Sequence, residues 1–351
     1  MKPPVLDIET GGRFLAYPAG LGGSEASTVR RLNFLAAATI AFAVICGTSV
    51  AQTYPSHPIT LIVPFPAGGG VDAVARIVAE KLASGLRQQV IIDNRGGVAG
   101  VIGMRVAAKA APDGYTIVMS HTGITAINPT LYVNPGYDPR RDFAPIGLIA
   151  TTPIVLMANT AFPVRTVADL IAMAKREPGK LNIGTPPPGT GSFLSAELFK
   201  AAAGIDFTIV TYKGTGPLTN DLIGGHVPIA FNVLAPAIGN LQAGNLRAIA
   251  TAGPTRLSLM PDVPTIAESG LPGFEAVLHY GLMAPAGTPA EIVIRLNGEL
   301  RTAVNAPEVK ARILADGGDP LPSTPQEYAA DIAREEPKWS ALIRKLGLRV
   351  E

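Results

Sequence analysis

The sequence predicts an α/β protein made of two lobes, each a mostly parallel sheet flanked by helices. Short runs rich in Ile, Val and Leu alternate with amphipathic helical stretches, which is the pattern of parallel strands covered by helices on both faces. The alternation occurs in two separate sets, one before residue 121 and one between residues 181 and 231. Two such sets in a chain of 351 residues are typical of two lobes.

In the first set, the apolar run at residues 59–65 predicts a strand, and residues 66–70 predict a tight glycine loop. From Val71 onward, apolar residues recur at the spacing of one helix face, which predicts a helix. The remaining elements expected here are a strand at 89–92, a helix at 101–110 and a strand at 115–120.

The second set repeats this order of strand, loop and helix. The expected elements are a strand at 181–184, a loop at 186–191, a helix at 193–203, a strand at 207–212, a loop at 213–217, a helix at 218–224 and a strand at 227–231. Two long apolar segments, residues 144–158 and 274–285, are expected to pass between the lobes and act as a hinge.

These elements divide the chain into two expected lobes. Lobe 1 comprises residues 52–155 and 281–351, and lobe 2 comprises residues 156–280. The last part of the chain, residues 289–348, is strongly helical, and its final helix, around residues 339–346, is expected to pack back on lobe 1.

The composition is that of a globular protein without a dominant charge. Of its residues, 47% are hydrophobic and 16% are charged, which suffices for large cores. The 29 Lys and Arg residues nearly balance the 27 Asp and Glu residues, so no overall field favours nucleic acid or an anionic membrane surface. Neither is expected as a partner, and a charged ligand must be held by local geometry.

Residues 1–51 predict a secretory signal peptide. Arg30 and Arg31 precede an apolar run at residues 34–46 and a stretch of small residues that ends at Ala51, where cleavage is expected. A twin-arginine signal and lipidation of Cys46 are the alternatives for this segment. Cleavage after Ala51 removes the only cysteine, so the mature chain is expected to lie in the periplasm without disulfides or thiolate sites.

Three glycine-containing loops join a strand end to a helix start, at residues 66–70, 188–192 and 213–216. Unpaired backbone N–H groups and the helix dipole favour an anion at such a junction. Ligands in open α/β sheets bind outside the carboxyl ends of the strands, so the three loops are expected to meet at one cleft. The alternative interpretation is that each loop is a plain tight turn.

Residues 120–122 follow a strand end and are expected to point into the same cleft. The alternative for His121 is a structural, hydrogen-bonded histidine, and His226 and His279 are interpreted as structural. No Gly-x-Ser-x-Gly or His-Glu-x-x-His motif occurs, and the spacing of Gly97, Gly100 and Gly103 is wrong for a dinucleotide fingerprint. No catalytic residue, metal site or cofactor is therefore expected.

Ordered motifs along most of the chain resemble those of one family, the tripartite tricarboxylate transporter receptors, also called the Bug family. The motifs lie at residues 58–59, 63–72, 93–100, 112–116, 128–132, 212–214, 225–227, 261–265 and 268–274. The resemblance implies a Venus-flytrap fold, that of periplasmic binding proteins, in which two lobes close on a small carboxylate and present it to membrane permease subunits. It implies no catalysis and a monomer.

The resemblance also implies that main-chain N–H groups and hydroxyls of the strand-to-helix loops hold the carboxylate. The full set of candidate ligand contacts is Pro66, Ala67, Gly68, Gly69, Ser120, His121, Thr122, Thr190, Gly191, Ser192, Lys213, Gly214, Thr215 and Gly216. The loop after Gly191 departs from the family pattern, and there Phe193 is expected to form an apolar wall for an aromatic or aliphatic acid.

Two other functions remain open at this stage. One is a ligand sensor that feeds a two-component system. The other is a secreted enzyme acting on a small organic acid, for which Ser120 and His121 are the only adjacent pair of interest, although neighbours on a strand point to opposite faces.

Overall fold

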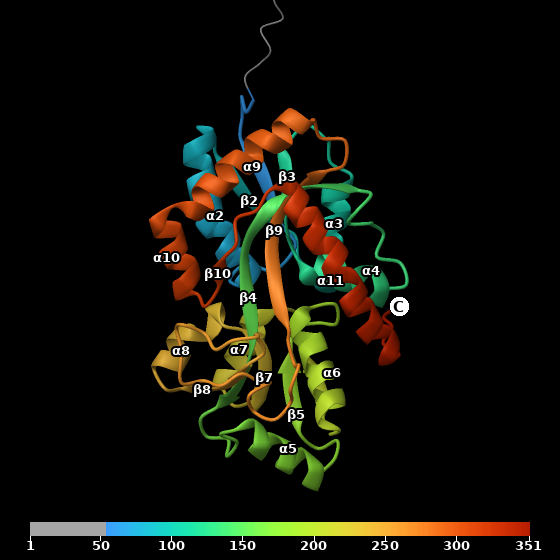
Figure 1. Ribbon diagram of the computed structural model, residues 1–351, viewed down its shortest axis with the longest axis vertical. Coiled ribbons are helices and arrows are strands. Elements are labelled where there is room, and N and C mark those ends of the chain that lie inside the picture. The colour runs from blue at the N-terminus through green and yellow to red at the C-terminus, as the bar shows by residue number, and fades with distance from the viewer. Residues whose placement is uncertain (1–53) are drawn as a thin grey trace, which may run out of the picture. The chain divides into compact units, whose positions relative to one another are not determined.

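Two sheets share one long strand in the computed structural model, which describes residues 54–351 (Figure 1). The shared strand is β4 (Phe143–Asn159). Residues 143–153 of β4 pair in the first sheet, and residues 154–159 pair in the second sheet. The expected signal peptide, residues 1–51, lies outside the described residues.

The first sheet has the strand order β2-β1-β3-β9-β4. Its strands besides β4 are β1 (Ile59–Val63), β2 (Val90–Asn94), β3 (Thr116–His121), β9 (Val277–Pro285) and, at the edge of β4, β10 (Asp319–Pro320). β1 runs parallel to β2 and β3, whereas β9 is antiparallel to both β3 and β4. In the first sheet, β1, β2 and β3 are therefore parallel, as expected. The pairs that involve β4 or β9, the two long apolar segments, are antiparallel.

The second sheet has the order β4-β7-β5-β6, with β8 on the other side of β4. Its strands are β5 (Asn182–Thr185), β6 (Thr208–Thr211), β7 (Ile229–Val233) and β8 (Leu246–Thr251). β5 is parallel to β6 and β7. The predicted α/β class with two lobes is confirmed. Each sheet has a parallel part, but neither is mostly parallel, because every pair that involves β4 or β9 is antiparallel.

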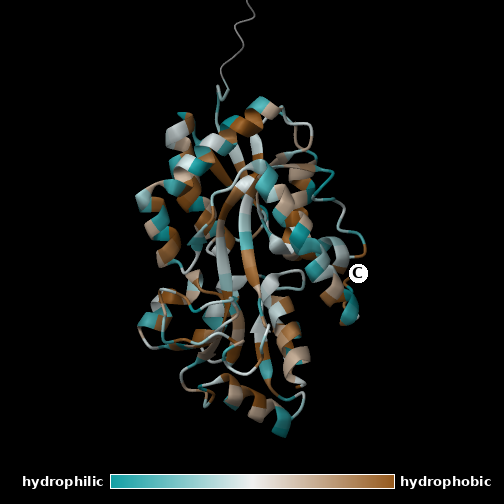
Figure 2. Ribbon diagram, in the orientation of Figure 1, coloured by the Kyte–Doolittle hydropathy of each residue, from teal (hydrophilic) through white to brown (hydrophobic). Residues whose placement is uncertain are grey.

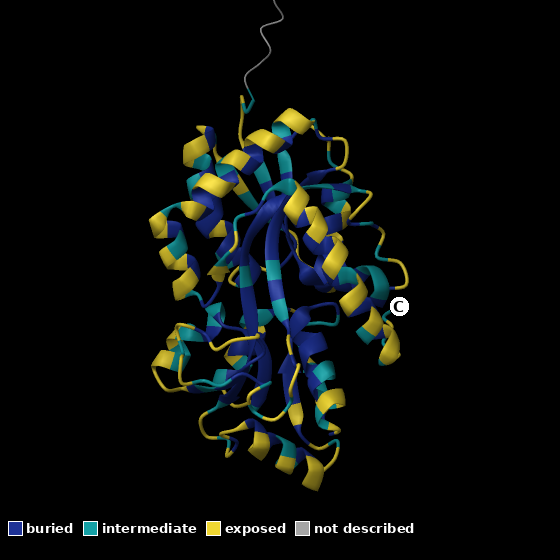
Figure 3. Ribbon diagram, viewed as in Figure 1, coloured by how far each residue is buried: buried dark blue, intermediate teal, exposed yellow. Residues whose placement is uncertain are grey.

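Both long apolar segments are strands. β4 passes from one sheet to the other, and β9 enters the first sheet directly after Ala276, whose N–H donates to the carbonyl of Ala252 beyond β8. Figure 3 shows both strands buried along most of their length. Burial on both faces explains why these segments are continuous apolar runs rather than alternating ones.

Helices cover both sheets, and Figure 2 shows polar residues on their outer faces. Around the first sheet lie α2 (Gly70–Leu86), η1 (Val98–Gly100), α3 (Val101–Ala108), η2 (Gly123–Ile127), α4 (Asn128–Leu131), α9 (Ala290–Asn305), α10 (Pro307–Ala315) and α11 (Pro325–Lys345). Around the second sheet lie α5 (Val167–Arg176), α6 (Gly191–Ala203), α7 (Thr215–Ile223), η3 (Ala235–Ala237) and α8 (Ile238–Gln242). The apolar face predicted for α2 is buried, from Val71 to Leu82.

The C-terminal helix α11 packs on β4 and η2 of the first lobe, as expected, but it begins earlier than expected and continues through Pro337. A proline inside a helix removes one backbone hydrogen bond. Burial of Tyr328, Ile332 and Trp339 on the inner face of α11 offsets this loss.

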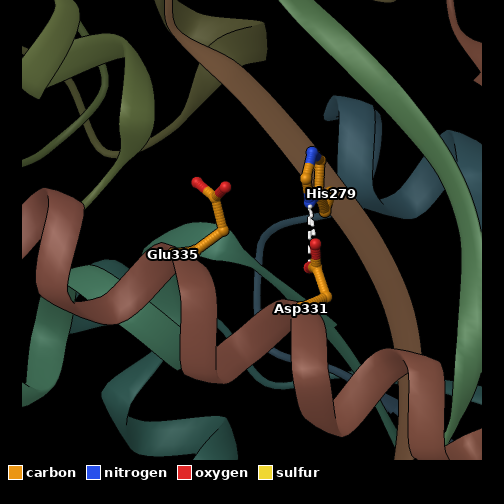
Figure 4. A group of neighbouring side chains, drawn as sticks. All are labelled: His279, Asp331 and Glu335. Carbon is orange, nitrogen blue, oxygen red and sulfur yellow. Dashed lines mark hydrogen bonds and ion pairs between the residues drawn. The ribbon is translucent and has the colours of Figure 1, made fainter.

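A cluster of His279, Asp331 and Glu335 ties α11 to β9 (Figure 4). Nδ1 of His279 lies 2.8 Å from Oδ2 of Asp331, and Arg334 also pairs with Asp331. Nε1 of Trp339 donates to Glu335 at 3.1 Å. Each carboxylate already has partners in the chain, so the geometry agrees with the structural interpretation of His279.

The start of α11 provides a test of the fold. Thr324 accepts a hydrogen bond from the N–H of Glu327, and Glu327 accepts one from the N–H of Thr324, which is a complete capping box. We expect Thr324→Ala to lower the free energy of unfolding by about 1 kcal/mol in denaturant titrations. Thr324→Ser is the control, because it keeps the hydroxyl. An unchanged midpoint in the alanine variant would contradict this account of the helix start.

Candidate functional site

Three helices begin around one cavity. α2 follows β1 in the first lobe, whereas α6 and α7 follow β5 and β6 in the second. The residues that line the cavity are Phe65, Pro66, Ala67, Gly69, Gly70, Val71, His121, Pro186, Thr190, Ser192, Gly214, Thr215, Gly216, Pro217, Val233, Leu278 and Tyr280. The cavity thus lies between the two lobes, at the carboxyl ends of parallel strands.

The start of α2 has no side-chain cap. Its N-cap residue is Gly69, and the amide of Gly70 donates to Oγ1 of Thr215 in the other lobe at 3.3 Å. The amide of Val71 lies in the first helical turn and has no intrahelical acceptor. The helix therefore presents N–H groups and its positive dipole end to the cavity.

Asp72, in this first turn, does not oppose an anion. Its carboxylate is buried and accepts hydrogen bonds from the N–H of Gly68, from Nε of Arg76 and from Nδ2 of Asn94, at 2.9–3.0 Å. Burial works to raise the pKa of Asp72, but the hydrogen bonds from Arg76, Gly68 and Asn94 outweigh it and hold the pKa below its usual value. The negative charge is thus compensated within the lobe.

The start of α7 is built in a similar way. Gly214 is its N-cap residue without a side-chain hydrogen bond, and Pro217 in the first turn has no N–H. The amides of Thr215 and Gly216 are the first-turn donors that remain, and both residues line the cavity.

At the start of α6 the hydroxyl of Thr190 already has partners: it accepts from the N–H of Phe193 at 3.3 Å and donates to the carbonyl of Pro187 at 2.8 Å. The first-turn amides of Gly191 and Ser192 lie next to this cap and have no intrahelical acceptor. α6 therefore adds a third set of donors to the same cavity.

His121 contributes a neutral side chain. It is 2% exposed, and its Nδ1 accepts a hydrogen bond from the N–H of Gly123 at 2.9 Å. Burial lowers the pKa of His121 to about 3, because the charged imidazolium would lose its hydration. In the neutral ring with Nδ1 as acceptor, Nε2 carries the proton.

The rest of the wall is apolar except for the hydroxyl of Tyr280. It comes from Phe65 and Val71 of the first lobe, from Val233 of the second, and from Leu278 and Tyr280 on β9. Within residues 54–351, the cavity lining contains no Lys, Arg, Asp or Glu. The site therefore combines dipolar donors with an apolar surface.

Comparison with known proteins agrees with this geometry. The family model for the tripartite tricarboxylate transporter family receptor matches residues 74–348. The chain belongs to this receptor family. BugT of Bordetella pertussis is 35% identical over 313 residues, which cover 89% of this chain and 96% of BugT.

Two solved structures of similar proteins show the same two-lobed fold. The Rhodopseudomonas palustris protein Rpa4515 with adipate has a TM-score of 0.82 and 35% identity, over 84% of this chain and 99% of that one. The periplasmic binding protein BugD has a TM-score of 0.81 and 34% identity, over 85% of this chain and all of BugD. The family consists of periplasmic receptors for carboxylates, and these relatives are solute-binding proteins rather than enzymes.

Most of the candidate contacts of the receptor lie at the cavity. The structure brings together Pro66, Ala67, Gly69, His121, Thr190, Ser192, Gly214, Thr215 and Gly216 in its lining. Gly68, Ser120, Thr122, Gly191 and Lys213 are not part of this lining. Gly191 and Lys213 are chain neighbours of lining residues, and the N–H of Gly68 donates to Asp72.

Ser120 and Thr122 lie behind the wall. Oγ of Ser120 lies 2.5 Å from Oη of Tyr328 and donates to the carbonyl of Gly281, and Oγ1 of Thr122 accepts from the N–H of His279. Ser120 and His121 point to opposite faces of β3, because side chains alternate along a strand. Ser120 and His121 are therefore not arranged as a nucleophile and its base.

The expectation for Phe193 needs correction. Its side chain is 8% exposed in the core beneath α6 and does not line the cavity. The apolar wall comes instead from strand positions such as Val233, Leu278 and Tyr280, which no sequence pattern had indicated. These residues are far apart in the sequence, and only the pairing of the strands brings them together.

The lobes also touch beside the cavity. Oη of Tyr132, which follows α4, donates to the carbonyl of Pro188 in the second lobe at 2.7 Å. Together with the bond from Gly70 to Thr215, this contact holds the lobes against each other. The receptor is therefore in a closed arrangement.

Removal of the Tyr132 hydroxyl tests this contact. We expect Tyr132→Phe to shift the ligand-free receptor toward open forms and to raise its radius of gyration in small-angle scattering, since one interlobe hydrogen bond contributes about 1 kcal/mol. Tyr212→Phe is the matched control, because its hydroxyl donates to Asp221 within the second lobe. Identical scattering curves for Tyr132→Phe and the wild-type receptor would show that this bond does not hold the lobes.

The buried neutral His121 predicts a pH dependence of stability. Its folded pKa of about 3 lies below the unfolded value of 6.5, so the unfolded chain takes up a proton first as the pH falls. The contribution of His121 is complete above pH 6.5 and decreases toward pH 3. Between pH 7 and pH 4, we expect the free energy of unfolding to fall by on the order of 3 kcal/mol more in the wild-type receptor than in His121→Gln.

Urea titrations of both proteins at the two pH values measure this difference. The comparison of two proteins cancels the titration of the other groups. Parallel pH profiles would mean that His121 is charged or solvated in the folded receptor.

Proposed function

We propose that this protein is a periplasmic receptor that captures a small carboxylate between its lobes and delivers it to the permease subunits of a tripartite tricarboxylate transporter. The observation that carries the proposal is the convergence of three helix starts on one cavity without charged side chains in its lining, within the described part of the chain. Family membership supports the same function.

The chemistry of such a cavity favours an anion. First-turn amides are strong donors that point along the helix axis, and the positive ends of the helix dipoles add to their effect. Closure of the lobes excludes water and strengthens each of these interactions. A carboxylate offers several acceptor positions, so it can take N–H groups from both lobes at once and hold the lobes together.

We assign the carboxylate contacts to the helix starts. In the first lobe they are the amides of Gly69 and Val71, and in the second lobe those of Ser192, Thr215 and Gly216. The flanking residues Pro66, Ala67 and Gly214 shape the approach of the ligand to the backbone. The similar protein Rpa4515 was solved with adipate, which supports a small organic acid as the ligand class.

The remaining parts of the proposal concern location and assembly. The receptor is exported by the signal peptide at residues 1–51 and acts as a monomer. Lobe 1 comprises residues 52–155 and 281–351, and lobe 2 comprises residues 156–280, so that the lobes close by bending of the crossing strands. Within residues 54–351, no helix has both the length and the apolar character that a membrane span needs.

Gly214 provides a direct test. Its backbone is extended, so other residues tolerate this conformation, and a Cβ atom would lie 3.7 Å from the ring of Pro66 in the other lobe. Gly214→Leu therefore fits the folded lobe but fills the interlobe gap. We expect it to weaken carboxylate binding at least a hundredfold while the melting temperature of the ligand-free protein stays within about 3 °C.

The protein is first unfolded and refolded to remove any co-purified ligand. Binding is then measured by calorimetric titration with adipate and a panel of small mono- and dicarboxylates. Gly239→Leu is the control, because Gly239 lies in α8 with open space around it. Failure of every acid to bind the wild-type receptor, with no acid detected by native mass spectrometry of the fresh protein, would refute the proposed function.

A further inference from the structure

His121 and Tyr280 form a pair of polar side chains in the apolar part of the cavity. They are register partners on the antiparallel strands β3 and β9, so both side chains stand on the same face of the sheet. Their ring centroids are 6.0 Å apart in an edge-to-face arrangement, and both residues line the cavity. They are therefore placed to contact the same ligand.

His121 can only donate toward the cavity. Its Nδ1 is occupied as an acceptor by the N–H of Gly123, which places the ring proton on Nε2. Within residues 54–351, Nε2 has no hydrogen-bond partner. Nε2 is not among the fully buried atoms that lack a partner, and His121 lines the cavity, so this N–H can be reached from the cavity and is available for a ligand atom.

Tyr280 adds a second donor, its hydroxyl, at the start of α2. The residue is 1% exposed, and its hydroxyl has no hydrogen-bond partner in the described part of the receptor. A Cβ atom placed on Gly70 would lie 3.4 Å from this hydroxyl, which locates it beside the first turn of the helix. Burial raises the pKa of Tyr280, so its proton stays in place at neutral pH.

Within the described residues, no carboxylate that could pair with a cation lines the cavity. The nearest carboxylate in the first turn of α2, Asp72, is paired with Arg76 and does not line the cavity. The surfaces beside the pair are those of Phe65, Val233 and Leu278. An ammonium group here would lose its hydration without gaining a counter-charge.

We propose that His121 and Tyr280 are specificity-determining residues that donate hydrogen bonds to an oxygen of the ligand and thereby select oxygen over nitrogen at this position. The proposal rests on the proposed function, in which the helix starts hold one carboxylate. The preferred ligand class is an acid with an apolar body and a second oxygen-bearing group, in the form of a carboxyl, carbonyl or hydroxyl. Amino acids with an ammonium group at that position are rejected.

Matched series of straight-chain acids test the proposal by calorimetric titration at pH 7. For chains of four to eight carbons, each series contains the dicarboxylate, the ω-hydroxy acid, the monocarboxylate and the ω-amino acid; for six carbons these are adipate, 6-hydroxyhexanoate, hexanoate and 6-aminohexanoate. At the chain length that binds best, we expect the dicarboxylate or the hydroxy acid to bind at least tenfold more tightly than the monocarboxylate. We expect no measurable binding of the amino acid.

Two variants test whether His121 and Tyr280 cause the preference for the oxygen-bearing acids. Tyr280→Phe removes only the hydroxyl, and His121→Leu removes the ring N–H; for both, the affinity ratio between the dicarboxylate and the monocarboxylate should fall at least threefold. Binding of the monocarboxylate itself should persist, because the helix amides are intact. Tyr212→Phe, outside the cavity, is the matched control with an unchanged ratio, and if His121→Leu does not fold, Tyr280→Phe alone decides.

The outcomes separate the two levels of the proposal. Equal affinity of the wild-type receptor for the monocarboxylate and the oxygen-bearing acids, or an unchanged ratio in Tyr280→Phe, would overturn the role of the pair and leave a carboxylate receptor. Binding of the ω-amino acid as tightly as the dicarboxylate would also overturn it. If no acid of any series bound to the wild-type protein, the proposed function itself would fail.

Discussion

The amides in the first turns of α2, α6 and α7 are the feature on which the rest of this receptor depends. A helix cannot satisfy these groups itself, and in a protein interior they need an acceptor. The purely structural helices α5 and α11 meet this need with complete capping boxes, at Thr166 and Thr324. α2 and α7 begin instead at Gly69 and Gly214, which offer no side-chain oxygen. At α2 and α7 the site thus has helix starts without a side-chain cap, whereas α6 is capped by Thr190 and contributes its remaining first-turn amides.

The surroundings of these amides avoid full charges. Asp72 is neutralised by Arg76 and further held by Asn94, and His121 is kept neutral by burial. A lysine or arginine in the cavity would bind an anion more strongly, but it would also carry a large desolvation cost on closure. Dipoles fixed by the backbone need no such reorganisation, because the folded helix already orients them.

The two crossing strands relate binding to lobe movement. β9 is tied to α11 through the pair of His279 and Asp331, and β3 is tied to the same helix through Ser120 and Tyr328. These ties hold β3 and β9 of the first sheet against α11. The contacts that close the cavity, at Tyr132 and Thr215, are few and polar by comparison. A structure in which α11 is tied to the first sheet and few polar contacts cross the cavity is suited to opening and closing.

The sequence by itself determined the α/β class, the two sets of units and the glycine loops, because strand and helix periodicity and glycine positions are local properties. It also indicated His121 as a cavity residue. Only the tertiary structure decided which side chains face the cavity: the strand pairing placed Tyr280 and Leu278 in the wall, turned Ser120 to the opposite face and left Phe193 in the core. Register and lobe contact depend on pairings between residues far apart in the chain, and a local pattern contains no information about them.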